Sequence, residues 1–170
     1  VVTKGGLAMG EGLEGLGRDY LALACEASLR RLQTDYIDVY MSHRADAKVP
    51  IEETLEAFQG LIDAGKIRHA GCSNYTAEEL EAALAASGGG RARYEVLQPL
   101  YNLADRAGYE GALEGVCLKH GLGVITYYAL AAGFLTGKYR SKEDLEGSSR
   151  GNVVSKFLNP AGLALLDAVA

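Results

Sequence analysis

Six polar residues of this sequence share one position, the carboxyl end of a predicted β-strand. Lys4 ends a short β-branched run and His43 follows a longer one. The others come where later predicted strands stop, and they are Ser73, Asn74, Gln98 and Tyr127. In parallel α/β proteins the carboxyl ends of the strands carry the active site. Five such strand ends in succession predict a ring of side chains around one pocket.

Each of these residues also has an ordinary structural explanation. Lys4 suits a solvated lysine at the start of a loop, and His43 suits a core histidine that bonds to the backbone. The Ser73-Asn74 pair suits a turn or a helix cap. Gln98 before a proline suits a plain strand end, and Tyr127 suits a core aromatic. Only their common position points to a shared pocket.

Strand and helix patterns alternate along the chain. Runs typical of strands cover residues 1–3, 36–41, 67–73, 94–97 and 123–127, with amphipathic helical stretches between them. Thr76 with Glu79 three residues later predicts a helix start. Pro160 opens a last apolar helix after a long polar loop. Such alternation implies parallel strands joined by right-handed crossovers.

Two architectures fit this alternation, an open doubly wound sheet and a (β/α)₈ barrel. Five predicted strands suit a flavodoxin-like open sheet, whereas a barrel needs eight units and about 250 residues. The pattern alone leaves both open. The glycines between Gly12 and Gly17 have the wrong spacing for a dinucleotide-binding fingerprint. Any dinucleotide must therefore be bound by another part of the structure.

The composition is that of an ordinary globular domain of 170 residues, 48% hydrophobic and 23% charged. A net charge of −5 provides no basic footprint for nucleic acid or an anionic membrane. No run of 18 apolar residues occurs, and the first residues read as a strand rather than a signal peptide. Three cysteines and three histidines lack metal-ligand spacing. We expect a cytoplasmic protein without a bound metal ion. The sequence does not indicate an oligomeric state.

Several longer stretches resemble the aldo-keto reductase family in order and spacing. They are residues 28–40 with His43-Arg44, and residues 50–57, 64–68, 71–74, 98–103 and 133–139. Together they extend over essentially the whole chain. The resemblance implies a (β/α)₈ barrel that binds NADP(H) in extended form across its carboxyl face. Residues 1–170 are then a partial barrel domain that corresponds to strands three to seven.

The resemblance also implies catalytic roles for two strand-end residues. Lys4 matches the family lysine, whose ammonium lowers the pKa of a tyrosine phenol so that it gives and takes protons. His43 matches the family histidine, which hydrogen-bonds the substrate oxygen and orients it for hydride transfer. The catalytic Asp and Tyr of the family precede the third strand, and no residue of this chain matches them.

The remaining matches concern the cofactor. Those that hold the nicotinamide carboxamide are Ser73, Asn74 and Gln98, and the aromatic that stacks on the nicotinamide ring is Tyr127. The matches to the phosphate loop and its basic side chains are Leu130, Ala131, Lys138 and Arg150. The segment after the stacking aromatic, Tyr128-Ala129-Leu130, departs from the Ser-Pro-Leu of many members, which affects the loop geometry.

We expect the whole protein to use NADP(H) to reduce a small aldehyde or ketone to an alcohol, or to oxidise the alcohol. The sequence specifies neither the substrate nor the choice between NADPH and NADH. The chain alone is expected to be inactive without the tyrosine, and prone to edge pairing because the barrel is not closed. Two alternatives are a cofactor-binding regulatory barrel without turnover, and an aldolase-like barrel in which Lys4 forms a Schiff base. The presence of His43 favours the reductase over the regulator.

Overall fold

A computed structural model describes residues 1–169 of the chain. The chain forms two compact units. The first comprises Val1–Pro99 and Ala112–Ile125, and the second comprises Leu100–Gly111 and Thr126–Ala170. The first unit contains a parallel β-sheet with its helices, and the second contains short helical segments around a small apolar core.

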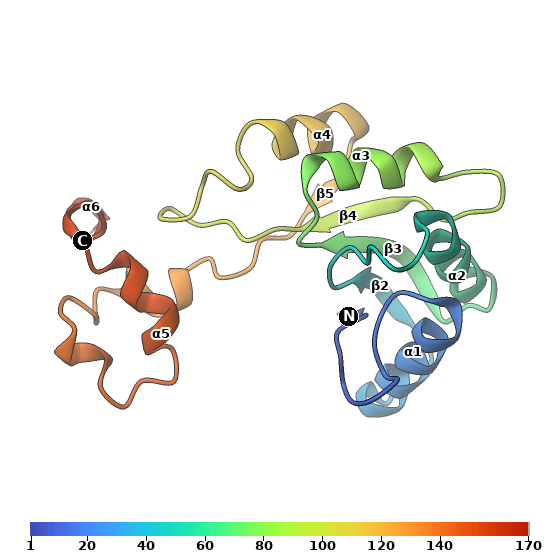
Figure 1. Ribbon diagram of the computed structural model, residues 1–170, viewed down its shortest axis with the longest axis horizontal. Coiled ribbons are helices and arrows are strands. Elements are labelled where there is room, and N and C mark those ends of the chain that lie inside the picture. The colour runs from blue at the N-terminus through green and yellow to red at the C-terminus, as the bar shows by residue number, and fades with distance from the viewer. Residues whose placement is uncertain (170) are drawn as a thin grey trace. The chain divides into compact units, whose positions relative to one another are not determined.

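The sheet of the first unit has five parallel strands in the order in which they occur along the chain. They are β1 (Val2–Gly5), β2 (Ile37–Ser42), β3 (Ile67–Ser73), β4 (Tyr94–Gln98) and β5 (Gly123–Val124). A doubly wound sheet reverses its strand order at the switch point, whereas a barrel adds each strand beside the previous one. The uninterrupted order, which Figure 1 shows from β2 to β5, is that of a partial (β/α)₈ barrel.

Four helices of this unit lie side by side along the sheet in Figure 1, each in contact with the next. They are α1 (Arg18–Leu32), α2 (Ile51–Asp63), α3 (Ala77–Ala86) and α4 (Ala112–His120). The predicted start of α3 is confirmed, because the Glu79 N–H donates to Thr76 Oγ1 at 3.2 Å and the Thr76 N–H donates to Glu79 Oε2 at 2.8 Å. Over residues 1–169, every helix is too short or too polar to cross a bilayer.

Aromatic rings and hydroxyls fill the core between the sheet and its helices. Phe58 of α2 contacts Tyr40 and Tyr94, with ring centroids 5.8 and 5.7 Å apart. Ser42 Oγ lies 3.1 Å from the phenol oxygens of both Tyr75 and Tyr94, so these hydroxyls satisfy one another. The Tyr40 hydroxyl is buried and has no hydrogen-bond partner among the described residues.

Loss of the hydroxyl is expected to have opposite effects at two of these tyrosines. Tyr40→Phe removes an unpaired buried hydroxyl, so the free energy of unfolding should stay the same or rise by up to about 1 kcal/mol. Tyr94→Phe breaks a bonded network and should lower it by about 1–2 kcal/mol. Urea unfolding of the whole protein, followed by circular dichroism, measures both variants. Equal losses would contradict the assignment of the unpaired hydroxyl to Tyr40.

The last strand is shorter than its sequence pattern predicts. Residues 123–127 have the pattern of one strand, but β5 extends over only Gly123–Val124. Tyr127 pairs with Leu100 through an isolated bridge within the second unit. Tyr128, the residue after the predicted strand, has a φ of 56° in the left-handed region, so the extended backbone ends before it.

The segment predicted as a long polar loop contains several short helical segments of the second unit. They are η1 (Ala131–Thr136), η2 (Glu143–Leu145), α5 (Gly151–Val154) and η3 (Ser155–Phe157), followed by α6 (Pro160–Val169). Their small core includes the stacked rings of Phe134 and Phe157, with centroids 5.1 Å apart. The loop prediction is wrong here because these apolar residues recur without a regular period. The helix predicted to open at Pro160 is confirmed as α6.

Candidate active site

The strand register places the predicted catalytic residues on one face of the sheet. Lys4 of β1 is in register with Met41 of β2, and Met41 with Gly71 of β3. Residues in register on neighbouring strands point to the same face, and so do residues two apart on one strand. His43 is two residues beyond Met41, so it shares the face of Lys4. Both side chains line one pocket of about 480 Å³.

Hydrogen bonds on both sides hold the backbone of His43. Its N–H donates to the Gly5 carbonyl at 2.9 Å, and its carbonyl accepts from Asn74 Nδ2 at 2.9 Å. Burial, together with the positive charges of Lys4 and Arg44, lowers the pKa of the half-buried His43 below its ordinary value of 6.5. At neutral pH the ring is therefore uncharged and presents one N–H donor and one acceptor.

The titration of His43 checks this arrangement directly. In the whole protein its Cε1 proton resonance is expected to titrate with a midpoint below 6.5. Because a neighbouring cation disfavours the imidazolium, Lys4→Met should move the midpoint toward higher pH. Lys48→Met should leave it in place, since the Lys48 side chain is 85% exposed and lies 3.8 Å from Glu14. A midpoint at or above 6.5 in the unchanged protein would contradict the burial and charge assignments.

Ser73, Asn74 and Gln98 come together at the ends of β3 and β4. Ser73 is in register with Gln98, and Ser73 Oγ donates to the Gln98 carbonyl at 2.8 Å. Asn74 has a φ of 57°, and its Nδ2 donates to Ser73 Oγ at 3.1 Å. The proton of the buried Ser73 hydroxyl is therefore already donated in a hydrogen bond to the Gln98 carbonyl. The Gln98 side-chain amide makes no hydrogen bond within residues 1–169 and keeps both its donors and its acceptor.

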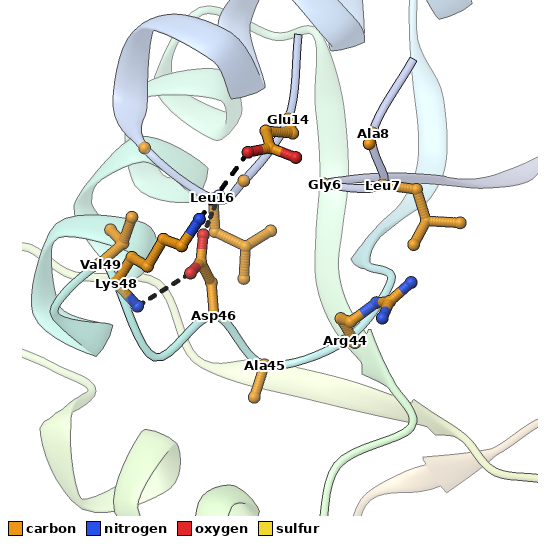
Figure 2. Close-up of a pocket in the computed structure, with 12 residues that line it drawn as sticks. Gly6, Leu7, Ala8, Glu14, Leu16, Arg44, Ala45, Asp46, Lys48 and Val49 are labelled. Atoms are coloured by element: carbon orange, nitrogen blue, oxygen red, sulfur yellow. Dashed lines mark hydrogen bonds and ion pairs between the residues drawn. The ribbon is translucent and has the colours of Figure 1, made fainter. Parts of the chain in front are cut away.

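A second pocket of the first unit lies between the loops that follow β1 and β2. Figure 2 shows its lining, which comes from residues 6–17 and 44–49 and encloses about 530 Å³. Asp46 connects the two loops, because its Oδ2 accepts from the Leu16 N–H at 3.0 Å. Its Oδ1 accepts from the Lys48 N–H at 2.9 Å. Sequence reasoning missed Asp46, and the only local signal is an Asp placed for an Asx turn.

In the second unit, Asn102 fixes the turn that carries Tyr127 and Tyr128. The buried Asn102 accepts through Oδ1 from the N–H groups of Ala104 and Asp105, both at 2.8 Å, and donates through Nδ2 to the Tyr128 carbonyl at 3.1 Å. The half-buried Tyr127 ring meets the Tyr128 ring edge-on, with centroids 5.4 Å apart. The aromatic predicted to stack on nicotinamide therefore belongs to a hydrogen-bonded turn.

The predicted phosphate loop has a left-handed backbone. Ala131, Ala132 and Gly133 have φ values of 49°, 56° and 98°. The Ala131 N–H donates to the Tyr128 carbonyl at 2.7 Å. Leu130 is exposed, and its N–H makes no hydrogen bond within the described part of the chain. Of the two predicted loop residues, Leu130 keeps a free backbone donor for an anion, whereas the Ala131 donor is used internally.

The two predicted phosphate cations lie against aromatic rings. Lys138 Nζ lies 4.8 Å from the ring centroid of Tyr139. Arg150 lies 5.5 Å from the ring centroid of Tyr128 and donates from Nη1 to the Tyr128 hydroxyl at 3.0 Å. Neither cation has a carboxylate partner among residues 1–169. Both charges are therefore available to an anion.

Comparison with known proteins identifies the family of the chain. Residues 1–169 match the Aldo/keto reductase family, and the chain belongs to that family. Aldo-keto reductase YhdN of Bacillus subtilis is 40% identical over 144 residues, which are 85% of this chain and 42% of that protein. A probable voltage-gated potassium channel subunit beta of Arabidopsis thaliana is 37% identical over 161 residues, which are 92% of this chain and 47% of that protein.

A solved structure shares the fold. A glycerol dehydrogenase from Gluconobacter oxydans superimposes with a TM-score of 0.77 at 30% identity, covering 99% of this chain and 53% of that chain. The chain spans about half the length of these relatives. The family resemblance and the partial barrel are thereby confirmed, while the roles of the individual site residues stay predictions.

Proposed function

We propose that the whole protein containing this chain is an oxidoreductase that reduces an aldehyde or ketone to the alcohol with NADP(H). The observation that carries the proposal is the placement of Lys4 and His43 on one sheet face and in one pocket. An ammonium and an uncharged imidazole suit the control of a proton at a carbonyl oxygen. Two relatives support this class of reaction, since one is named an aldo-keto reductase and the other a glycerol dehydrogenase.

Lys4 and His43 have different tasks in this reaction. The neutral His43 ring donates a hydrogen bond to the carbonyl oxygen of the substrate and orients it. Lys4 holds a positive charge near the proton donor, a tyrosine in the family, and lowers the pKa of that phenol so that it releases its proton to the same oxygen. A bound nicotinamide supplies the hydride.

The residues of the sheet edge fit the nicotinamide end of the cofactor. A carboxamide carries both donors and acceptors, and the Gln98 amide, which makes no hydrogen bond to the described residues, offers the complement. Asn74 contributes a second amide, and Ser73 contributes an oxygen lone pair. In the second unit, Tyr127 offers a ring face of the kind that stacks on a nicotinamide.

The residues of the second unit fit the phosphates. Within residues 1–169, Leu130 provides a backbone N–H that makes no hydrogen bond, and Lys138 and Arg150 provide charges without carboxylate partners. Ala131 shapes the loop through its left-handed backbone rather than through its own N–H.

NADPH fluorescence tests the proposal on the whole protein and on residues 1–170 side by side. The whole protein is expected to shift the fluorescence of NADPH and to oxidise NADPH when an aldehyde is added. Residues 1–170 alone are expected to show no turnover, because the family's catalytic tyrosine is absent from this chain. A whole protein that does not bind NADPH contradicts the proposal.

A second candidate is a regulatory barrel that binds the cofactor without turnover. The observation that favours it is the 37% identity to a protein named a probable voltage-gated potassium channel subunit beta. NADPH binding with no oxidation by any of a panel of aldehydes, ketones and quinones would decide for the regulator. A His43-dependent turnover would decide for the reductase.

A further inference from the structure

Arg44, the residue after His43, carries a positive charge with no carboxylate partner among residues 1–169. Its side chain is exposed and lines the pocket between the loops that follow β1 and β2. Figure 2 shows the guanidinium extending away from Asp46, with no interaction drawn to either carboxylate of the pocket. Over residues 1–169, Arg44 forms no ion pair and its guanidinium makes no hydrogen bond. Its planar fork of N–H donors is therefore open to a ligand.

The other charges of this pocket already have partners. Asp46 accepts from the backbone N–H groups of Leu16 and Lys48, at 3.0 and 2.9 Å. The Lys48 ammonium lies 3.8 Å from Glu14. Among the described residues that line the pocket, Arg44 is therefore the one charged side chain that has neither a hydrogen bond nor an ion pair.

The adjoining pocket, which contains the proposed catalytic pair, is basic. Gly6 and Leu7 line both pockets, so the two pockets adjoin at the loop that follows β1. The charged residues that line the adjoining pocket are Lys4, Arg30 and Arg31, and no carboxylate of the described chain lines it. The chain has a net charge of −5, so this positive charge is a local feature. Such a site attracts anions and raises their local concentration.

We propose that Arg44 binds a carboxylate or phosphate group of the carbonyl substrate, which makes anionic aldehydes or ketones the preferred substrates. The inference rests on the proposed function, because that function places the reacting carbonyl at His43. A guanidinium matches two oxygens of either group in a bidentate arrangement.

Two observations connect Arg44 with the substrate rather than with the cofactor. Arg44 follows His43 directly in the chain, and the pocket that Arg44 lines adjoins the pocket of His43 at Gly6 and Leu7. The cofactor phosphates have the same chemistry as a substrate phosphate, but Lys138 and Arg150 are already their candidate partners.

Steady-state kinetics of the whole protein with matched substrates test this proposal. Glyceraldehyde is compared with glyceraldehyde 3-phosphate, and butyraldehyde with succinic semialdehyde, at saturating NADPH. In Arg44→Gln, kcat/KM for the two anionic aldehydes is expected to fall roughly 10- to 100-fold, because a charged hydrogen-bond pair is lost. For the two neutral aldehydes it should stay the same. Arg44→Lys keeps the charge but loses the planar pair of N–H donors, so its kcat/KM for the anionic aldehydes should lie between those of the unchanged protein and Arg44→Gln.

Lys48→Gln is the matched control. It removes one positive charge from the same loop and pocket, but from a side chain already close to Glu14, so it should change no substrate preference. Two results would overturn the proposal. One is an equal loss for neutral and anionic aldehydes in Arg44→Gln. The other is a weaker binding of NADPH by that variant, which would assign Arg44 to the cofactor.

A binding measurement separates this proposal from the proposed reaction. Calorimetry without NADPH determines the dissociation constant of glycerol 3-phosphate, which has the anionic group but no carbonyl to reduce. We expect the constant to rise roughly 10- to 100-fold in Arg44→Gln and to stay unchanged in Lys48→Gln. If the whole protein reduces no aldehyde, the proposed reaction fails, while Arg44-dependent binding still supports the anion site. Equal binding by Arg44→Gln and the unchanged protein overturns it.

Discussion

Lys4→Met is expected to lower kcat for aldehyde reduction by the whole protein roughly 10²- to 10⁴-fold, the range typical of a lost proton-transfer contribution. Methionine retains most of the side-chain length and removes the ammonium. Without this charge the pKa of the donating phenol rises, and its proton is released less readily. Lys4 lines the pocket of His43, at the end of β1, so the loss should fall on the chemical step and leave the dissociation constant of NADPH unchanged.

The pH dependence distinguishes an effect on the proton donor from a loss of structure. In alcohol oxidation the donor must be ionised, so a raised pKa moves the pH midpoint of kcat upward in Lys4→Met. Lys48→Met is the control, because it removes the same group from an exposed side chain near Glu14 and should keep the original kcat. An unchanged kcat in Lys4→Met, or a change confined to KM, argues against the proton-transfer role.

Lys138→Gln combined with Arg150→Gln is expected to raise the NADPH dissociation constant by at least about 100-fold, because two charged contacts to phosphate are lost. Both cations lie against rings, so phosphate binding breaks no ion pair. The phosphates do not react, and kcat at saturating NADPH should therefore change little. Fluorescence titration at low and high salt measures the affinity, and its salt dependence should be weaker in the double variant.

Arg140→Gln is the control from the same unit. Arg140 Nη1 donates to Asp167 at 2.8 Å, in an exposed ion pair, and such pairs contribute little. Its loss should leave NADPH affinity nearly unchanged. If Arg140→Gln weakens NADPH binding as much as the double variant does, the effect is a general loss of positive charge, and Lys138 and Arg150 have no specific role.

Much of the local structure could be predicted from the sequence, because it depends on neighbours within a few residues. The strand expected over 67–73 coincides with β3, and the capping box of Thr76 and Glu79 forms as predicted. The carboxyl ends of parallel strands carry the active site in α/β proteins. For this reason the strand ends also indicated that Lys4 and His43 come together at one edge.

The choice of architecture could not be read from these patterns. Each strand and helix fits equally well in an open sheet and in a barrel, because local periodicity does not say which strand lies next to which. The family motifs predicted the barrel, and the strand order β1-β2-β3-β4-β5 confirms it. In the second unit the local pattern itself was not informative, because the apolar residues of its core around Phe134 and Phe157 recur without a regular period.

The sequence by itself determined the helices of the first unit and α6, most of the strands, the family, and the residues expected at the carboxyl edge. Only the tertiary structure decided which polar groups are already satisfied. Asp46 is engaged by the Leu16 N–H, 30 residues away, while Arg44 has no partner among residues 1–169. Hydrogen bonding along a helix or strand acts over a few residues, but the pairing of charges depends on segments that meet only when the chain folds. That difference is why Lys4 and His43 were visible in the sequence and the free guanidinium of Arg44 was not.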